Sequence, residues 1–95
     1  MADPTLLILS SLADGAKHGY AMMTDIAEFA GVSLGPGTLY GAISRLEKDG
    51  LIEATTPTTR RQPYRITALG RKHLEAQIAA LAPVIRVGAR RLRNA

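Results

Sequence analysis

The side chains best suited to chemistry in this 95-residue chain are cationic, and they lie on or beside one short predicted helix. Six small, polar or positive residues fall on the exposed side of that helix, at about 100° per residue: Gly37, Thr38, Gly41, Ser44, Arg45 and Lys48. A further pair, Arg60 and Arg61, stands in the turn-rich link that follows. Paired arginines on a protruding loop are placed to meet phosphates or a minor groove. These residues predict the binding of a polyanion.

Catalytic and metal chemistry find little support in the sequence. There is no cysteine, which excludes a disulfide, a thiolate nucleophile and a thiolate metal site. His18 and His73 lack partners at metal-ligand spacing, so we interpret them as surface or helix-start residues. The segment 35–37 is not a phosphate loop, because no strand precedes it and no lysine and hydroxyl pair follows. We predict no catalytic residue, no metal and no cofactor.

The helix that carries the first set of residues has recognisable ends and a recognisable core side. Gly35 can cap it, Pro36 suits its first position, and Gly50 can close it in the left-handed conformation. Its apolar residues share one side: Leu39, Ala42, Ile43 and Leu46. The slim opposite side would fit a major groove about 12 Å wide. A plain solvated face has the same composition, although each exposed glycine weakens a helix by about 1 kcal/mol and therefore argues against it.

Two short strands are predicted directly after this helix. The first covers residues 51–55, and the second covers residues 64–67 with alternating polarity. Pro57 and Pro63 fit only at the margins of such a ribbon, because proline cannot donate a ladder hydrogen bond. A helix followed by a ribbon with a protruding cationic loop is typical of a winged helix.

Three further helices complete the expected fold. The first starts at Asp3 and Pro4 and runs to Leu12, and the second covers residues 19–30. A tight linker at 32–34 then suits a helix-turn-helix pair. The fold class is therefore α+β and mostly helical. We expect a winged helix-turn-helix DNA-binding domain over residues 1–67 and a C-terminal dimerisation helix with a basic tail over residues 68–95.

The last helix carries a heptad pattern after a cap at Thr67. Its apolar residues recur in alternating steps of four and three, and those proposed for dimerisation are Leu74, Ile78, Leu81, Ile85 and Leu92. A body this small cannot cover so long a helix, so we predict a twofold homodimer. Packing on its own subunit alone is the alternative. Pro83 removes the bond to the Ala79 carbonyl, from which we expect a kink or a fresh start near Ala82.

The net charge of +4 is unevenly distributed along the chain. Residues 1–44 hold one base against four acids, giving −3, whereas residues 45–95 hold eleven bases against four acids, giving +7. The positive field thus starts in the 36–49 helix and continues through the loop and the tail. No segment has the pattern of a membrane-lying helix, a secretion signal or a membrane span. We expect a soluble, cytoplasmic protein without a membrane partner.

Several short motifs in a fixed order resemble the phenolic-acid regulator, or PadR, family of transcriptional repressors over about residues 6–82. They are the leucine-rich first helix, His18–Tyr20, Gly37–Tyr40, Leu46–Ile52, Tyr64–Thr67 and Gly70–Arg71. The resemblance implies a winged-helix homodimer whose binding to double-stranded operator DNA a small-molecule effector can relieve. It also implies that Tyr20, Thr38, Tyr40, Arg60 and Arg61 touch DNA. Gly41 stands where many members carry proline, which slims the helix further, and the short tail after Arg71 counts against a large effector pocket.

Other interpretations stay open at this stage. The rings of Tyr20 and Tyr40 can instead cap the core edge with their hydroxyls in solvent.

A repressor dimer would place its 36–49 helices in major grooves about one turn apart on a pseudo-palindrome. The rival is a winged-helix protein–protein interaction module without sequence-specific DNA binding. A small hydrophobic effector could enter between the first and last helices, among leucines and methionines, and change the angle between the subunits. The operator, the regulated genes and the effector are not identified by the sequence.

Overall fold

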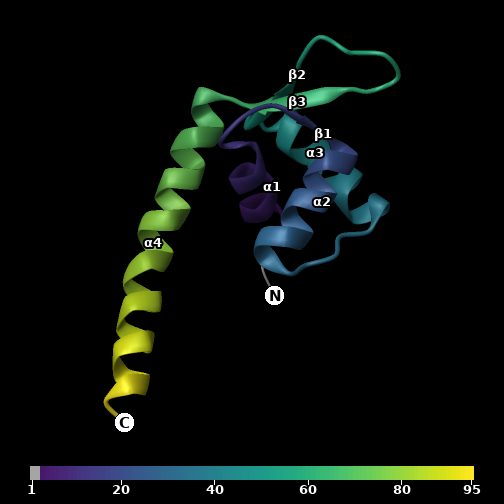
Figure 1. Cartoon of the computed structure of the whole chain (residues 1–95). Coiled ribbons are helices and arrows are strands. Elements are labelled where there is room, and N and C mark those ends of the chain that lie inside the picture. Colours follow the sequence, from purple (N-terminus) through teal and green to yellow (C-terminus); the bar gives the residue numbers. More distant parts are fainter. Residues whose placement is uncertain (1–2) are drawn as a thin grey trace.

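Residues 3–95, which the structure describes, fold into four helices and a small three-stranded sheet. The elements are, in order, α1 (Pro4–Leu12), β1 (Lys17–His18), α2 (Gly19–Ala30), α3 (Pro36–Lys48), β2 (Ile52–Ala54), β3 (Pro63–Ile66) and α4 (Ala68–Arg93). In this computed structural model the first three helices pack together, and the sheet lies across one end of them (Figure 1). The long α4 runs past α1 and continues beyond the body (Figure 1). The fold is the predicted winged helix-turn-helix with a long C-terminal helix.

The core lies where the apolar sides of α1, α2 and α3 meet. Its most deeply buried side chains are Ile8, Leu9, Leu12, Met22, Ile26, Leu39, Ile43, Leu46 and Ile52. Burying one such side chain contributes about 1.5–3 kcal/mol. α1 is apolar on most of its sides, and these sides are buried because α1 contacts α2, α3 and α4. The packed helices hold α3 in a fixed orientation, with its other side in solvent.

The sheet has one more strand than the sequence predicted. Its order is β1-β3-β2, and both neighbouring pairs are antiparallel. β2 and β3 occupy the predicted ribbon with slightly different limits, and Ile52 lies opposite Ile66. β1 pairs His18 with Pro63 along the second edge of β3. β1 has only two residues, too few to show the alternating polarity of a strand, so no local sequence pattern predicts it.

The ends of the helices follow the predicted caps. The Asp3 carboxylate accepts a hydrogen bond from the Thr5 amide at 3.0 Å, and the Thr67 hydroxyl accepts one from the Gly70 amide at 3.0 Å. Gly35 and Pro36 begin α3 as expected. Gly50, with a φ of 77°, directs the chain so that the buried Leu51 donates its amide to the Leu46 carbonyl at 3.0 Å.

The long C-terminal helix is continuous. α4 runs through Pro83 as one helix, so of the expected kink or fresh start near Ala82 the fresh start is wrong. Proline removes one intrahelical bond, but the preceding Ala79–Ala82 segment consists of strong helix formers and the helix continues on both sides. The described residues span 54 × 26 × 20 Å because the second half of α4 projects (Figure 1). Within residues 3–95, no helix has the length and apolar character needed to cross a membrane.

Candidate nucleic-acid interface

The outer side of α3 is open to solvent over its whole length. The six residues predicted for it are all exposed: Gly37, Thr38, Gly41, Ser44, Arg45 and Lys48. A Cβ atom added at Gly37 or at Gly41 would meet nothing within 4 Å. The inner side is buried through Leu39, Ala42, Ile43 and Leu46. α3 therefore presents a slim, positively charged ridge on a rigid base.

The wing, residues 55–62, is a protruding loop with an ordered base and a tight tip. At the tip, Thr58 and Arg61 exchange backbone hydrogen bonds of 3.1 and 2.9 Å. At the base, the side-chain amide of Gln62 donates through Nε2 to the backbone carbonyls of Thr55 and Pro63 at 2.7 and 2.8 Å. Arg60 adopts a φ of 67°, a left-handed conformation that costs a side-chain-bearing residue about 1–2 kcal/mol. Both wing arginines line the space between the wing and the body of the molecule.

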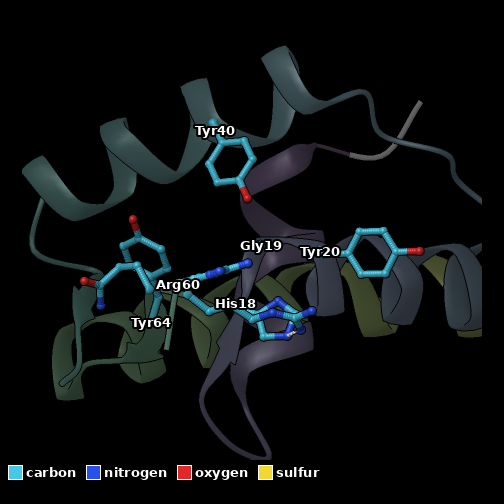
Figure 2. Close-up of a pocket in the computed structure, with 8 residues that line it drawn as sticks. His18, Gly19, Tyr20, Tyr40, Arg60 and Tyr64 are labelled. Carbon is cyan, nitrogen blue, oxygen red and sulfur yellow. Dashed lines mark hydrogen bonds between the residues drawn. The ribbon is translucent and has the colours of Figure 1, made fainter. Parts of the chain in front are cut away.

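A pocket of about 440 Å³ lies between the wing, α3 and the start of α2. This wing pocket is lined by His18, Gly19, Tyr20, Tyr40, Arg60, Arg61, Gln62 and Tyr64 (Figure 2). The Tyr40 ring extends from α3 with its hydroxyl directed at Gly19 (Figure 2), where a Cβ atom would collide with the phenol. Glycine at position 19 thus lets the Tyr40 phenol lie directly against the start of α2, and a larger residue there would displace the ring. Tyr40 is 48% exposed and Tyr20 is 69% exposed, with the Tyr20 ring pointing away from the pocket (Figure 2).

His18 is a pocket residue that the sequence analysis placed only at a helix start. Its Nδ1 atom lies 3.3 Å from the Ala21 amide and caps α2, as a helix-start residue should. Its Nε2 atom lies 2.6 Å from Nη1 of Arg61, 43 residues along the chain. The pairing of β1 with β3 makes this contact possible. The sequence signals were the position of His18 directly before a glycine-initiated helix and its place in the His18–Tyr20 motif, and neither indicates the contact with Arg61.

Tyr64 closes the inner wall of the pocket beneath α3 (Figure 2). Partial burial, the negative charge of Glu47 and the neighbouring Tyr40 raise the pKa of the Tyr64 phenol above its ordinary value of 10.0. The hydroxyl is therefore neutral near physiological pH and can donate a hydrogen bond.

The comparisons with known proteins decide the family. The model of the family described as transcriptional regulator PadR-like matches residues 8–76, which include the second half of α1, all of α2 and α3, the three strands and the first part of α4. The chain belongs to the PadR-like family. Its members are transcriptional regulators rather than enzymes, and among residues 3–95 no group of three or more metal-ligating side chains is found.

Two relatives are similar over most of this chain. Transcriptional regulator Rv3488 of Mycobacterium tuberculosis is 37% identical over 84 residues, covering 85% of this chain and 78% of that protein. An uncharacterised 37.1 kDa protein in transposon Tn4556 of Streptomyces fradiae is 41% identical over 80 residues. That match covers 84% of this chain, which spans only 23% of the transposon protein.

Solved structures match the PadR-like fold closely. A PadR family regulator from Clostridium difficile superposes with a TM-score of 0.83 at 26% identity, covering 94% of this chain and 97% of that one. Bacillus subtilis PadR, in complex with operator DNA, superposes with a TM-score of 0.67 at 24% identity, covering 78% of this chain and 45% of that one.

The residues predicted for dimerisation of this PadR-like chain occupy two different environments. Leu74 is 7% exposed and belongs to the core of its own subunit, so it is not available to a partner as the heptad pattern implied. The other four are exposed: Ile78, Leu81, Ile85 and Leu92. The first three of these line an apolar groove of about 280 Å³ between α1, the end of α2 and α4. The groove lies where an effector pocket was expected and contains leucines, but its lining residues include no methionine.

Proposed function

We propose that this PadR-like domain acts in the cytoplasm as a dimeric repressor that binds a pseudo-palindromic operator through α3 and the wing. The observation that carries the proposal is the open, slim side of α3 flanked by the wing arginines. A major groove about 12 Å wide admits a helix whose backbone can come close to the base edges. The complex of Bacillus subtilis PadR with operator DNA supports this role for the shared fold.

Ten side chains or backbone positions would contact the DNA in this proposal. Those on α3 would enter the groove: Gly37, Thr38, Gly41, Ser44, Arg45 and Lys48. Those around the wing pocket would meet the phosphate backbone: Tyr20, Tyr40, Arg60 and Arg61. The exposure of Tyr20, and the closeness of Tyr40 to the wing arginines in one pocket, support this division.

The proposed dimer is formed by the second half of α4. Every residue from Glu75 onward is exposed except Gln77 and Val87, which are partly buried. The apolar groove lies on one side of this segment, and a second apolar hollow, lined by Pro83, Val84, Val87, Gly88 and Arg91, lies on the helix itself. A second copy related by a twofold axis would cover both surfaces.

The division into a DNA-binding part at residues 1–67 and a dimerisation part at residues 68–95 belongs to the same proposal. Leu74 packs into the winged-helix core, so the segment free for a partner begins after it. We place a small hydrophobic effector at the bottom of the same groove, beside Ile78 and Ile85, where the second copy would cover it. Binding there would change the angle between the subunits and hence the spacing of the two α3 helices, without touching the DNA surface.

The experiment that tests this function measures sequence preference. The full chain is titrated into its own upstream promoter fragment and into a scrambled duplex of equal length and composition, at several salt concentrations. We expect the promoter to bind more tightly, with two protected half-sites about one helical turn apart in a footprint. Equal affinities would contradict the repressor and favour a protein-interaction module that uses the same surface.

A further inference from the structure

The wing pocket has the electrostatic character of an anion site. Its eight lining residues include two arginines, a histidine and three tyrosines, and none of them carries a carboxylate. Within residues 3–95, the ion pairs join Lys17 to Asp14 and Arg65 to Glu53. Neither wing arginine is thus neutralised by an acidic partner. Two adjacent cations are held toward one hollow without a counterion from the protein.

The hydrogen bonds around His18 cannot all be satisfied at once. A neutral imidazole has one N–H donor and one acceptor nitrogen. In this structure both ring nitrogens face donors: the Ala21 amide lies 3.3 Å from Nδ1, and the Arg61 guanidinium lies 2.6 Å from Nε2. If Nδ1 accepts and caps α2, Nε2 carries a proton that points at Arg61. If Nε2 accepts from Arg61, the α2 cap is lost.

An acceptor in the wing pocket would remove this conflict. If the exposed Arg61 side chain moves away from Nε2 of His18, an acceptor can enter between the two and take a hydrogen bond from each, and Nδ1 could keep the cap on α2. Arg60 and the Tyr40 hydroxyl face the same hollow (Figure 2). The start of α2 adds the positive end of its dipole. Several donors around one point match a group with several oxygens and a negative charge, for which arginine is well suited.

We propose that the wing pocket binds one phosphate group, with Arg61 and the Nε2–H of His18 as its principal donors and Arg60 and Tyr40 as further ones. The group can be a phosphodiester of the DNA backbone or free inorganic phosphate, because both offer the same oxyanion. Free phosphate therefore competes with DNA for this pocket. The DNA part of this inference depends on the proposed function, whereas the binding of free phosphate does not.

The first experiment uses inorganic phosphate as the probe and the full, ¹⁵N-labelled chain. Phosphate is titrated against chloride at equal ionic strength and pH, while amide and histidine side-chain nitrogens are observed by NMR. We expect saturable shifts at residues 18–21 and 60–62, and a His18 ring that carries its proton on Nε2. Shifts no larger than those in chloride, or spread over all basic residues, would overturn the pocket.

Two variants separate the pocket from general charge. His18→Asn keeps a side-chain oxygen that can accept from the Ala21 amide, and asparagine is a favourable cap, but it lacks the Nε2 donor. We expect its phosphate dissociation constant to rise about tenfold, which corresponds to about 1.4 kcal/mol. Arg90→Ala removes one charge from the far end of α4 and should change nothing. Equal weakening by both variants would contradict the assignment.

The second experiment distinguishes DNA from free phosphate as the ligand. DNA affinity is measured in phosphate and in chloride at equal ionic strength, for the unmodified chain and for His18→Asn. Competition predicts weaker DNA binding in phosphate for the unmodified chain, and a smaller difference for the variant. If phosphate binds to the chain but weakens DNA binding equally in the unmodified chain and in His18→Asn, then DNA and free phosphate do not share this site. Failure of the chain to prefer its promoter would count against the proposed function alone, since the NMR titration tests the pocket independently.

Discussion

Arg45 and Lys48 lie in the last turn of α3, where their charges also favour the helix dipole. Both are exposed, so their removal should cost less than about 0.5 kcal/mol of folding free energy. We expect Arg45→Ala combined with Lys48→Ala to weaken promoter binding by about tenfold or more. Fluorescence anisotropy measures the affinity, and thermal denaturation measures the stability. Lys72→Ala with Arg93→Ala is the matched control; equal effects on affinity would remove the α3 ridge from the interface.

Ser11 is a polar side chain inside the core, only 2% exposed. Its hydroxyl donates to the Asp25 carboxylate at 2.7 Å and so joins α1 to α2. Ser11→Ala leaves this partly buried carboxylate without that donor, so we expect a loss of about 1 kcal/mol in the free energy of unfolding. Urea denaturation measures it, with the exposed Ser33→Ala as the control. An unchanged midpoint would mean that water replaces the hydroxyl.

Tyr64 predicts a specific dependence of stability on alkaline pH. Because the pKa of its phenol is raised in the folded chain, the folded state holds this proton more tightly than the unfolded state does. The resulting stability is fully present below pH 10.0, the ordinary value, and is lost as pH rises through the raised pKa. Tyr64→Phe should remove this part of the alkaline decline, whereas the exposed Tyr20→Phe should keep it. Urea denaturation midpoints measured at a series of pH values above and below 10.0 test this prediction. Parallel pH profiles for the two variants would show that Tyr64 does not contribute to the alkaline decline in stability.

At the scale of elements, prediction succeeded where local residues decide the structure. Asp3, Gly35, Gly50 and Thr67 cap or close helices through their own side chains or backbone, and these signals are local in sequence. β1 depends instead on the second edge of β3, which lies more than 40 residues away, so no local pattern marks it. The same pairing brings His18 to Arg61. Sequence reasoning therefore located the arginines and the tyrosines but not the residue that joins them.

The wing is the element whose contribution to DNA binding can be measured separately. Arg60 and Arg61 would together neutralise the one phosphate held in the wing pocket, and each neutralised phosphate adds about 0.9 to the slope of affinity against salt on a logarithmic scale. We expect Arg60→Ala with Arg61→Ala to flatten that slope by about one per subunit. Affinities over a salt series provide the measurement, and Lys72→Ala with Arg93→Ala is again the control. An unchanged slope would place the wing outside the interface.

At the scale of the whole molecule, the body of this chain is small and its last helix is long. The first turns of α4 are anchored through Leu74, whereas the following turns leave Ile78, Ile85 and Leu92 exposed at 52%, 67% and 81%. Exposed apolar residues are what the heptad pattern requires at these positions, and their role in a dimer stays a prediction. The heptad pattern could not distinguish Leu74 from these exposed residues. The apolar spacing is the same in the part of α4 that packs on the core of its own subunit and in the part that projects from it.

Ile78 therefore tests the assembly better than Leu74 does. An aspartate at position 78 would put a charge into the apolar groove that we propose a second copy covers, without entering the core. We expect Ile78→Asp to sediment as a monomer with unchanged helicity by circular dichroism, and to lose cooperative binding to two half-sites. Lys72→Asp introduces the same side chain on an exposed part of α4 and should remain a dimer. If Ile78→Asp also stays dimeric, the subunits must associate through another surface, and the groove would be left to the effector alone.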